Sequence, residues 1–206
     1  MSDDKHSGHI INRTGLPDRF PTNRHEPAFW EALGRVVGTF GFLEDILCKA
    51  IFGITATKQY QEDEIEDAFK KWAKTLENAL VDPLGNLIIK YEEAIRKGAL
   101  WNEKFDEISK DLRDVAKYRN AICHGSWGPP DAAGATIPFF IDRKKTPFRT
   151  PIDTVFLNNL QKRTASLCCD IIDTVTCMGW QFPGSNGPGK IIWPQSSVKD
   201  RNSYPL

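Results

Sequence analysis

Apolar residues recur at spacings of three and four positions through the first half of the chain. Between positions 29 and 51 this spacing is kept by Phe29, Leu33, Val36, Val37, Phe40, Leu43, Leu47 and Ile51. The pattern predicts an amphipathic helix, which we expect to end at Gly53. A second helix is predicted over 62–80. It opens with an acidic run, which suits the positive end of the helix dipole.

Three more helices are predicted downstream, over 86–97, 103–124 and 152–179. Gly98 ends the first of them, and Gly125 follows the second at the place of a left-handed C-cap. The apolar stripe of the 103–124 helix consists of Phe105, Ile108, Leu112, Val115 and Ile122. That of the 152–179 helix consists of Phe156, Leu160, Leu167, Ile171, Val175 and Met178.

The remaining segments lack helical periodicity. Residues 126–151 are rich in proline and glycine and include a β-favouring stretch, which predicts a long loop with a short β-hairpin. Residues 1–25 are expected to form a flexible arm, and residues 181–206 a Pro/Gly-rich tail. The predicted fold is all-α: one domain over 26–180, a four- to five-helix antiparallel bundle with a loop or hairpin excursion before the last helix.

Composition narrows the function classes. The 206 residues include 27 basic and 27 acidic side chains, so the chain does not coat nucleic acid by bulk charge, and nucleic-acid chemistry would need a local site. The five cysteines form no C-x-x-C pair, which argues against a disulfide scaffold or a zinc finger. We expect a cytoplasmic protein without a secretory signal or membrane span, and with no metal or cofactor.

Two charged residues interrupt the apolar stripes. A helical projection places Glu44 between Phe40 and Leu47, and places Arg119 in the stripe of the 103–124 helix. Burying an isolated charge costs several kcal/mol or more, so each group needs an opposite charge, hydrogen bonds or a wet cavity. The simplest expectation is that Glu44 and Arg119 meet, either as a structural ion pair or at a functional cavity.

The 103–124 helix ends on a group of polar residues. Arg119 is followed by Asn120 and, four positions later, by His124, so these side chains are neighbours on a helix. A histidine in the last turn lies near the negative end of the dipole, which favours its protonated form and allows proton transfer near neutral pH. The alternative is that His124 caps carbonyls and Asn120 makes a local hydrogen bond.

The order Arg119-Asn120-x-x-x-His124-Gly125, at the end of the penultimate helix of an all-α domain, resembles the signature of the HEPN superfamily (higher eukaryotes and prokaryotes nucleotide-binding domain). Glu44 resembles the acidic position that many members carry in their first helix. The resemblance covers about residues 26–180. The long loop over 126–151 departs from it.

The resemblance implies a chemistry. Many HEPN proteins are metal-independent endoribonucleases, often toxins or phage-defence effectors, and they act as dimers with a composite cleft. By this resemblance Arg119 would stabilise the scissile phosphate, His124 would transfer the proton, Asn120 would orient the histidine or the phosphate, and Glu44 would hold Arg119. The product would be a 2′,3′-cyclic phosphate, which requires RNA. The implied partners are a second copy, RNA, and a cognate antitoxin or other partner protein.

Other residues are candidates for binding the substrate. Six basic residues lie between positions 143 and 163: Arg143, Lys144, Lys145, Arg149, Lys162 and Arg163. They would form an entry rim for a polyanion, although three basic residues at a hairpin tip are also common as a solvated turn. Trp127 would either stack on a base or pack as a hydrophobic plug over the helix end.

Two further functions remain open. One is a non-catalytic HEPN-like module that binds a nucleotide, RNA or protein. The other is a helical dimerisation protein whose Glu44 and Arg119 pair only for packing. Cys123 adjoins His124, but adjacent helical residues point about 100° apart and do not share one ligand geometry. His6, His9 and His25 lie in the arm and receive no role.

Overall fold

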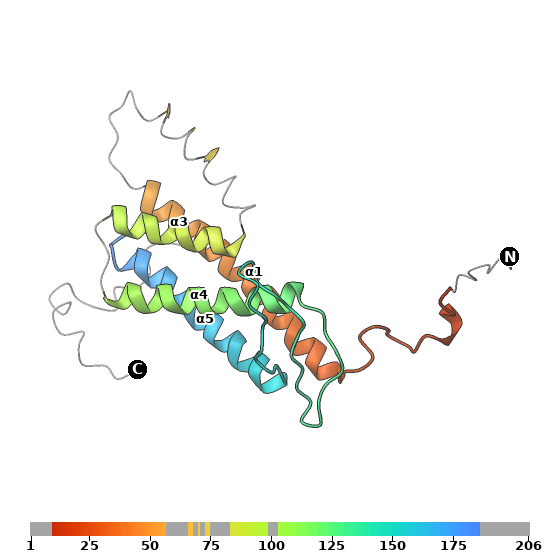
Figure 1. Cartoon of the computed structure of the whole chain (residues 1–206). Coiled ribbons are helices and arrows are strands. Elements are labelled where there is room, and N and C mark those ends of the chain that lie inside the picture. The colour runs from red at the N-terminus through yellow and green to blue at the C-terminus, as the bar shows by residue number, and fades with distance from the viewer. Residues whose placement is uncertain are drawn as a thin grey trace.

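The computed structural model describes residues 10–56, 83–98 and 103–185, together with 66, 67, 70, 73 and 74. Within them the named elements are a short 3-10 helix, η1 (Arg13–Gly15), and four α-helices: α1 (Pro27–Ala56), α3 (Leu84–Lys97), α4 (Glu103–His124) and α5 (Thr154–Thr176). The all-α prediction is confirmed (Figure 1). Most of the helix predicted over 62–80 lies outside the described residues.

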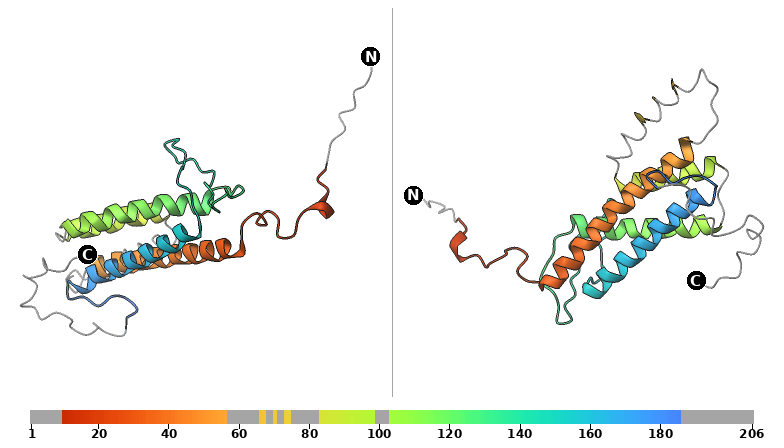
Figure 2. Two further views of the ribbon diagram at one scale, coloured as in Figure 1. Left: turned by 90° about the horizontal axis from the view of Figure 1, so that it is seen from below. Right: turned by 180° about the vertical axis from the view of Figure 1, so that it is seen from behind.

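The helices form two layers. Seen from below, α3 and α4 lie in one layer and α1 and α5 in the other (Figure 2). The helix α4 runs opposite to α1 and α5, so the predicted antiparallel relation between α4 and α5 is confirmed (Figures 1 and 2). The most extensive contact is between α1 and α5, which run in the same direction.

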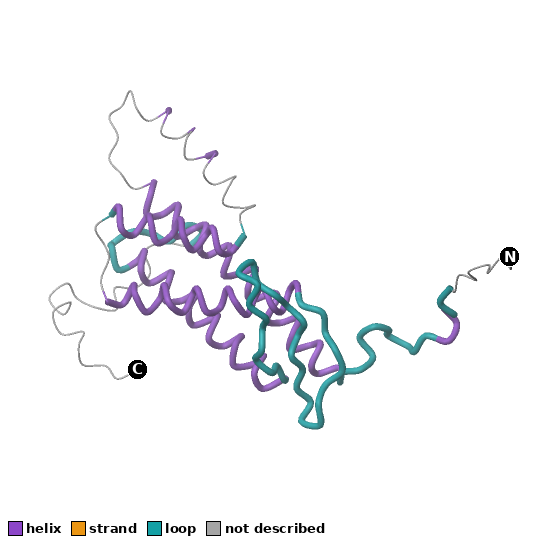
Figure 3. Tube along the Cα trace, in the orientation of Figure 1, coloured by secondary structure: helices purple, strands orange, loops and turns teal. Residues whose placement is uncertain are grey.

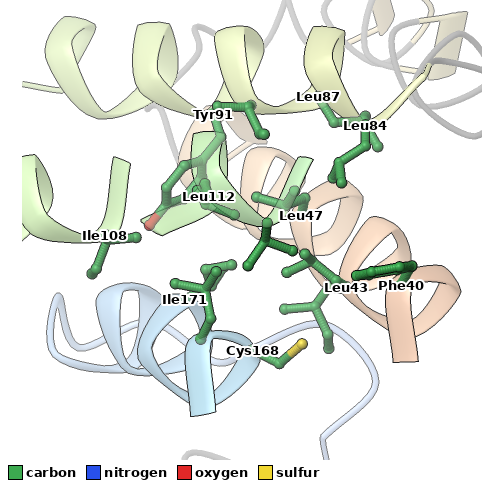
Figure 4. Packing of buried hydrophobic residues seen from close by; sticks show 14 of the residues in the cluster. Phe40, Leu43, Leu47, Leu84, Leu87, Tyr91, Ile108, Leu112, Cys168 and Ile171 are labelled. Carbon is green, nitrogen blue, oxygen red and sulfur yellow. The ribbon is translucent and has the colours of Figure 1, made fainter. Parts of the chain in front are cut away.

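The core fills the space between these layers. Leu47 of α1, Leu112 of α4 and Ile171 of α5 meet Tyr91 of α3 near its centre (Figure 4). Tyr91 is 2% exposed, and its hydroxyl lies 3.0 Å from Thr174 Oγ1 on α5. This hydrogen bond satisfies the only polar group of a side chain that is otherwise surrounded by apolar residues.

A buried carboxylate joins α3 to α4. Glu92 is 9% exposed; its Oε2 accepts a hydrogen bond from Arg113 Nη2 at 2.7 Å, and its Oε1 accepts one from the Ser109 hydroxyl. A carboxylate at this depth requires such partners, because an unpaired buried charge is costly.

Helix boundaries follow local chemistry, with one correction. Asp153 caps α5 by accepting a hydrogen bond from the Phe156 amide at 2.6 Å. The expected end of the first helix at Gly53 is wrong, because α1 continues to Ala56. A Cβ at Gly53 would lie 3.2 Å from Val175 Cγ1, so this glycine permits close packing against α5.

The connection from α4 to α5 is a loop throughout (Figure 3). It contains three isolated antiparallel bridges, Ser126 with Phe139, Thr136 with Ile152, and Ile141 with Pro147. No strand is present among the described residues, so the expected short β-hairpin is not supported. Prolines at 138, 147 and 151 supply no amide hydrogen, which prevents these bridges from extending into a ladder.

The ends of the packed structure differ slightly from the predicted boundaries. From residue 10 to η1 and beyond, the chain extends away from the bundle (Figure 1). Packing begins by His25, which is 9% exposed, and includes Phe182, which is 6% exposed. Residues 1–9 and 186–206 of the predicted arm and tail lie outside the described residues. Among those described, no helix has the length and apolar character needed to cross a membrane.

Candidate functional site

The helices α1 and α4 bring Glu44 and Arg119 together, as the helical projection predicts. Arg119 Nη2 lies 3.3 Å from Glu44 Oε1. The two side chains are 22% and 28% exposed, respectively. The pair therefore lies at a partly wet position at the edge of the core rather than in a dry interior.

The ion pair is loosely aligned. Glu44 Oε1 is itself buried, yet it accepts no hydrogen bond from the described residues. Its contact with Arg119 is therefore electrostatic rather than a bidentate fork. This arrangement attracts the guanidinium to one position and leaves donor groups available to another ligand.

Arg119 also contacts His124. Its Nη1 lies 3.1 Å from His124 Nε2. A guanidinium only donates hydrogen bonds, so Nε2 accepts here, and a neutral ring carries its proton on Nδ1. A ring with protons on both nitrogens has no acceptor and could not make this contact. Glu44, Arg119 and His124 thus form one chain of contacts at the end of α4.

Asn120 does not join this chain. It is exposed, and its side chain makes no hydrogen bond to His124 or to any other residue that the structure describes. The structure thus brings two of the three predicted catalytic side chains into contact and leaves the third facing solvent.

Gly125 has a different role from the expected one. The described glycines with positive φ are Gly134, Gly179 and Gly184, so the predicted left-handed C-cap at Gly125 is wrong. A Cβ on Gly125 would lie 2.4 Å from the Ala121 carbonyl oxygen and 2.8 Å from Pro138 Cβ. Glycine is needed because the loop returns to pack directly on the end of α4, beside His124.

Trp127 packs inward, and its ring contacts are with residues at the start of α1. It is half-buried and makes an edge contact with Phe29, with ring centroids 5.3 Å apart. Trp30 and His25 adjoin the same ring at 6.5 Å and 6.4 Å. Its indole therefore joins the loop to the first turn of α1.

His25 is a residue that the sequence reasoning missed. Its ring stacks on Phe29 at 4.3 Å, and its Nε2 lies 2.6 Å from Thr136 Oγ1 in the loop. Burial lowers the pKa of His25, which favours the neutral ring. Its position two residues before Pro27, at the start of α1, was the only sequence signal of this role.

The basic residues Arg143, Lys144 and Lys145 lie at an exposed turn. Asp142 shapes the turn, because its Oδ1 accepts hydrogen bonds from the amides of Lys144 and Thr146, both at 2.8 Å. None of the three basic side chains has an ion-pair partner among the described residues.

Arg163 is not part of a free basic rim. Its guanidinium pairs with Asp111 of α4 and lies 3.7 Å from Asp114 Oδ2. These carboxylates raise the pKa of Arg163 and engage its charge within the protein. Arg163 is therefore not available to the predicted polyanion-binding rim.

Cys123 adjoins the site but is a poor nucleophile. Partial burial of its thiol raises its pKa, and Glu44 adds to this effect while Arg119 opposes it. Because the thiolate is the reactive form, this shift makes Cys123 a weaker nucleophile than an ordinary cysteine. Cys168 is buried in the core, and burial raises the pKa of its thiol to about 12.

The chain matches no family model, no curated protein and no solved structure. The contacts at the end of α4, and the motif to which they belong, are what the molecule itself offers about its function.

Proposed function

We propose that this protein is a metal-independent endoribonuclease of HEPN type, with its site at the end of α4. One observation carries the proposal: a single guanidinium, that of Arg119, contacts both the Glu44 carboxylate and the His124 imidazole. An anchored cation beside a solvent-exposed base is the combination that phosphoryl transfer to an internal hydroxyl requires.

Arg119 would bind the scissile phosphate. Its fork geometry matches phosphate oxygens, and Glu44 keeps the guanidinium in place without using all its donors. A phosphate that takes the Nη1 donor also releases His124 Nε2 from the contact seen here. Substrate binding thereby frees the base at the place where it is needed.

His124 would then accept a proton. The ribose 2′-hydroxyl loses its proton to Nε2 as its oxygen attacks phosphorus, and the bond from phosphorus to the 5′-oxygen breaks. The 5′-oxygen takes up a proton, leaving a 5′-hydroxyl on one product and a 2′,3′-cyclic phosphate on the other. DNA lacks the attacking hydroxyl, so RNA is the substrate.

The proposal includes a homodimer, in which His124 of a second copy supplies the proton to the 5′-oxygen. Light scattering at tens of micromolar should give twice the monomer mass in solution, with or without RNA. A monomer under both conditions would contradict the composite cleft.

A cytoplasmic toxin or phage-defence effector restrained by a cognate antitoxin is the cellular role that fits such an activity. Expression of the wild type should then slow growth of the producing cell, and His124→Ala should not. Equal growth with the two proteins would contradict this role.

The catalytic test compares RNA cleavage by the wild type, His124→Ala and Arg119→Ala in excess chelator. Loss of either group should reduce the rate by about 10²- to 10⁴-fold. Cys123→Ser is the matched control, since it changes the neighbour of His124 without removing a proposed catalytic group, and it should retain activity.

A binding module is the second candidate, and the position of Asn120 favours it. A catalytic histidine with no orienting amide is less well held than the motif implies, because Asn120 faces solvent. Suppose that neither the wild type nor any variant cleaves RNA, and that His124→Ala and Arg119→Ala still bind RNA or a protein partner. The protein would then be a binding module and not an enzyme.

A further inference from the structure

The loop between α4 and α5 carries an exposed apolar stripe. Ile137, Phe139 and Ile141 are 49%, 74% and 50% exposed. They alternate along an extended segment with Thr136 and Pro138, which are buried. Alternating residues of an extended chain share one face, so the three apolar side chains lie on the outer face of the loop.

This stripe lies close to His124. Phe139 and Ser126 exchange both backbone hydrogen bonds, at 2.8 Å and 3.0 Å, and Ser126 is two residues beyond His124. A hydrogen-bonded antiparallel pair has Cα atoms about 5.5 Å apart, and two residues of chain span at most about 7 Å. The Cα atoms of Phe139 and His124 are therefore within about 13 Å of one another by this geometry.

The turn that follows the stripe is basic. Arg143, Lys144 and Lys145 follow Phe139 by four to six residues, and four residues span at most about 14 Å. The exposed ring of Phe139 is therefore within a short span of chain of both the His124 end of α4 and a turn with three cations. Aromatic rings for bases and cations for phosphates are the two components of single-strand binding surfaces.

We propose that Phe139 is the residue on which a base of the single-stranded substrate stacks, with the Arg143–Lys145 turn contacting the adjoining phosphates. This inference rests on the proposed function and names how that site holds its substrate. It assigns to Phe139 the role that the sequence suggested for Trp127, whose ring packs against Phe29 instead.

Charge favours a nucleic acid over a second copy of the chain as the occupant. The acids of the loop over 126–151 are Asp131 and Asp142. Each uses its Oδ1 to accept two backbone amides of its own turn. A self-complementary interface on this face would offer the three cations little opposite charge, whereas a phosphate backbone supplies it.

The test is binding of a fluorescent single-stranded DNA oligonucleotide to the full chain, measured by anisotropy. DNA presents bases and phosphates and is not cleaved by the proposed chemistry, so binding is measured apart from catalysis. Loss of one stacked base costs about 5- to 150-fold in affinity, and Phe139→Ala should show a loss of this size. Phe139→Leu should lose as much affinity as Phe139→Ala, and Phe139→Trp, which keeps an aromatic ring, should retain the affinity of the wild type.

Ile137→Ala is the matched control, because it removes apolar area from the same stripe without removing a ring, and it should change affinity by less than about twofold. Circular dichroism checks that each variant keeps its helices. The inference is overturned if the wild type does not bind the oligonucleotide, or if Phe139→Ala binds it as tightly as the wild type does. It is also overturned if Phe139→Leu retains full affinity, or if Phe139→Ala changes only the oligomeric state. RNA cleavage is scored separately, so ring-dependent binding without cleavage would refute the proposed enzyme and support this surface.

Discussion

Arg119 is the residue on which the site depends, because its guanidinium contacts a carboxylate on another helix and an imidazole on its own. Helical periodicity predicted the meeting of Glu44 and Arg119, since an interruption of an apolar stripe is visible in the sequence. Their exposure was not predictable, because it depends on how α1 and α4 pack at that level.

The coupling of Glu44 and Arg119 should be modest. A double-mutant cycle of Glu44→Ala and Arg119→Ala should give about 1 kcal/mol, because water reaches both side chains and the hydrogen-bond alignment is poor. Removal of one partner from a fully buried pair would cost about 3 to 5 kcal/mol. Urea unfolding measures the difference. A coupling of zero would show that the two groups do not interact in solution.

Gly125 should be intolerant of a side chain. Gly125→Ala places a methyl group 2.8 Å from Pro138 Cβ of the loop and 2.4 Å from the Ala121 carbonyl oxygen of α4, and overpacking of this kind costs about 1 to 3 kcal/mol. Gly128→Ala is the matched control, since a Cβ there meets nothing within 4 Å. If thermal or urea unfolding gave the two variants equal stability, the close approach of the loop to α4 would be wrong.

At the scale of elements, Glu92 joins α3 to α4. Glu92→Ala leaves the buried Ser109 hydroxyl without its partner, which should cost about 1 to 3 kcal/mol in unfolding free energy. The neighbouring Glu93→Ala is the control, because Glu93 makes an exposed contact with Lys97 at 3.3 Å, and such pairs contribute little. Equal losses in the two variants would contradict the buried junction.

His25 connects the loop to α1 and should make stability depend on pH. Burial lowers its pKa in the folded state below the ordinary 6.5, so the unfolded chain binds a proton more readily. This contribution to stability is fully present above about pH 6.5 and is lost as the pH falls below it. Urea unfolding at pH 7.5 and 5.5 should show a larger loss for the wild type than for His25→Gln, and equal losses would exclude this role.

These elements show where sequence reasoning succeeds and fails. Apolar periodicity predicted α3, α4 and α5 within a few residues, because it reports burial along one helix. It gave the wrong end for α1, since Gly53 allows contact with Val175 on α5. It also missed His25, whose partner Thr136 is far away in the sequence. Contacts between distant segments produce no periodic pattern in the sequence of either segment.

For the whole molecule, two layers of helices hold the end of α4 at the surface beside a loop that supplies an aromatic ring and cations. The motif is visible in the sequence, and the structure shows that Arg119 contacts Glu44 and His124. The neutral charge of the chain fits the proposal that RNA is recognised at a few positions rather than along a broad charged surface.

The central claim is that Arg119 and His124 cleave RNA by attack of its own 2′-hydroxyl, and the ends of the products test it most directly. A mixed RNA incubated with the wild type in excess chelator should yield 5′-hydroxyl and 2′,3′-cyclic phosphate termini, and the equivalent DNA should stay intact. His124→Ala should yield neither terminus while keeping its helical circular dichroism. Cleavage that persists unchanged in His124→Ala, requires added magnesium or leaves other termini would contradict the account.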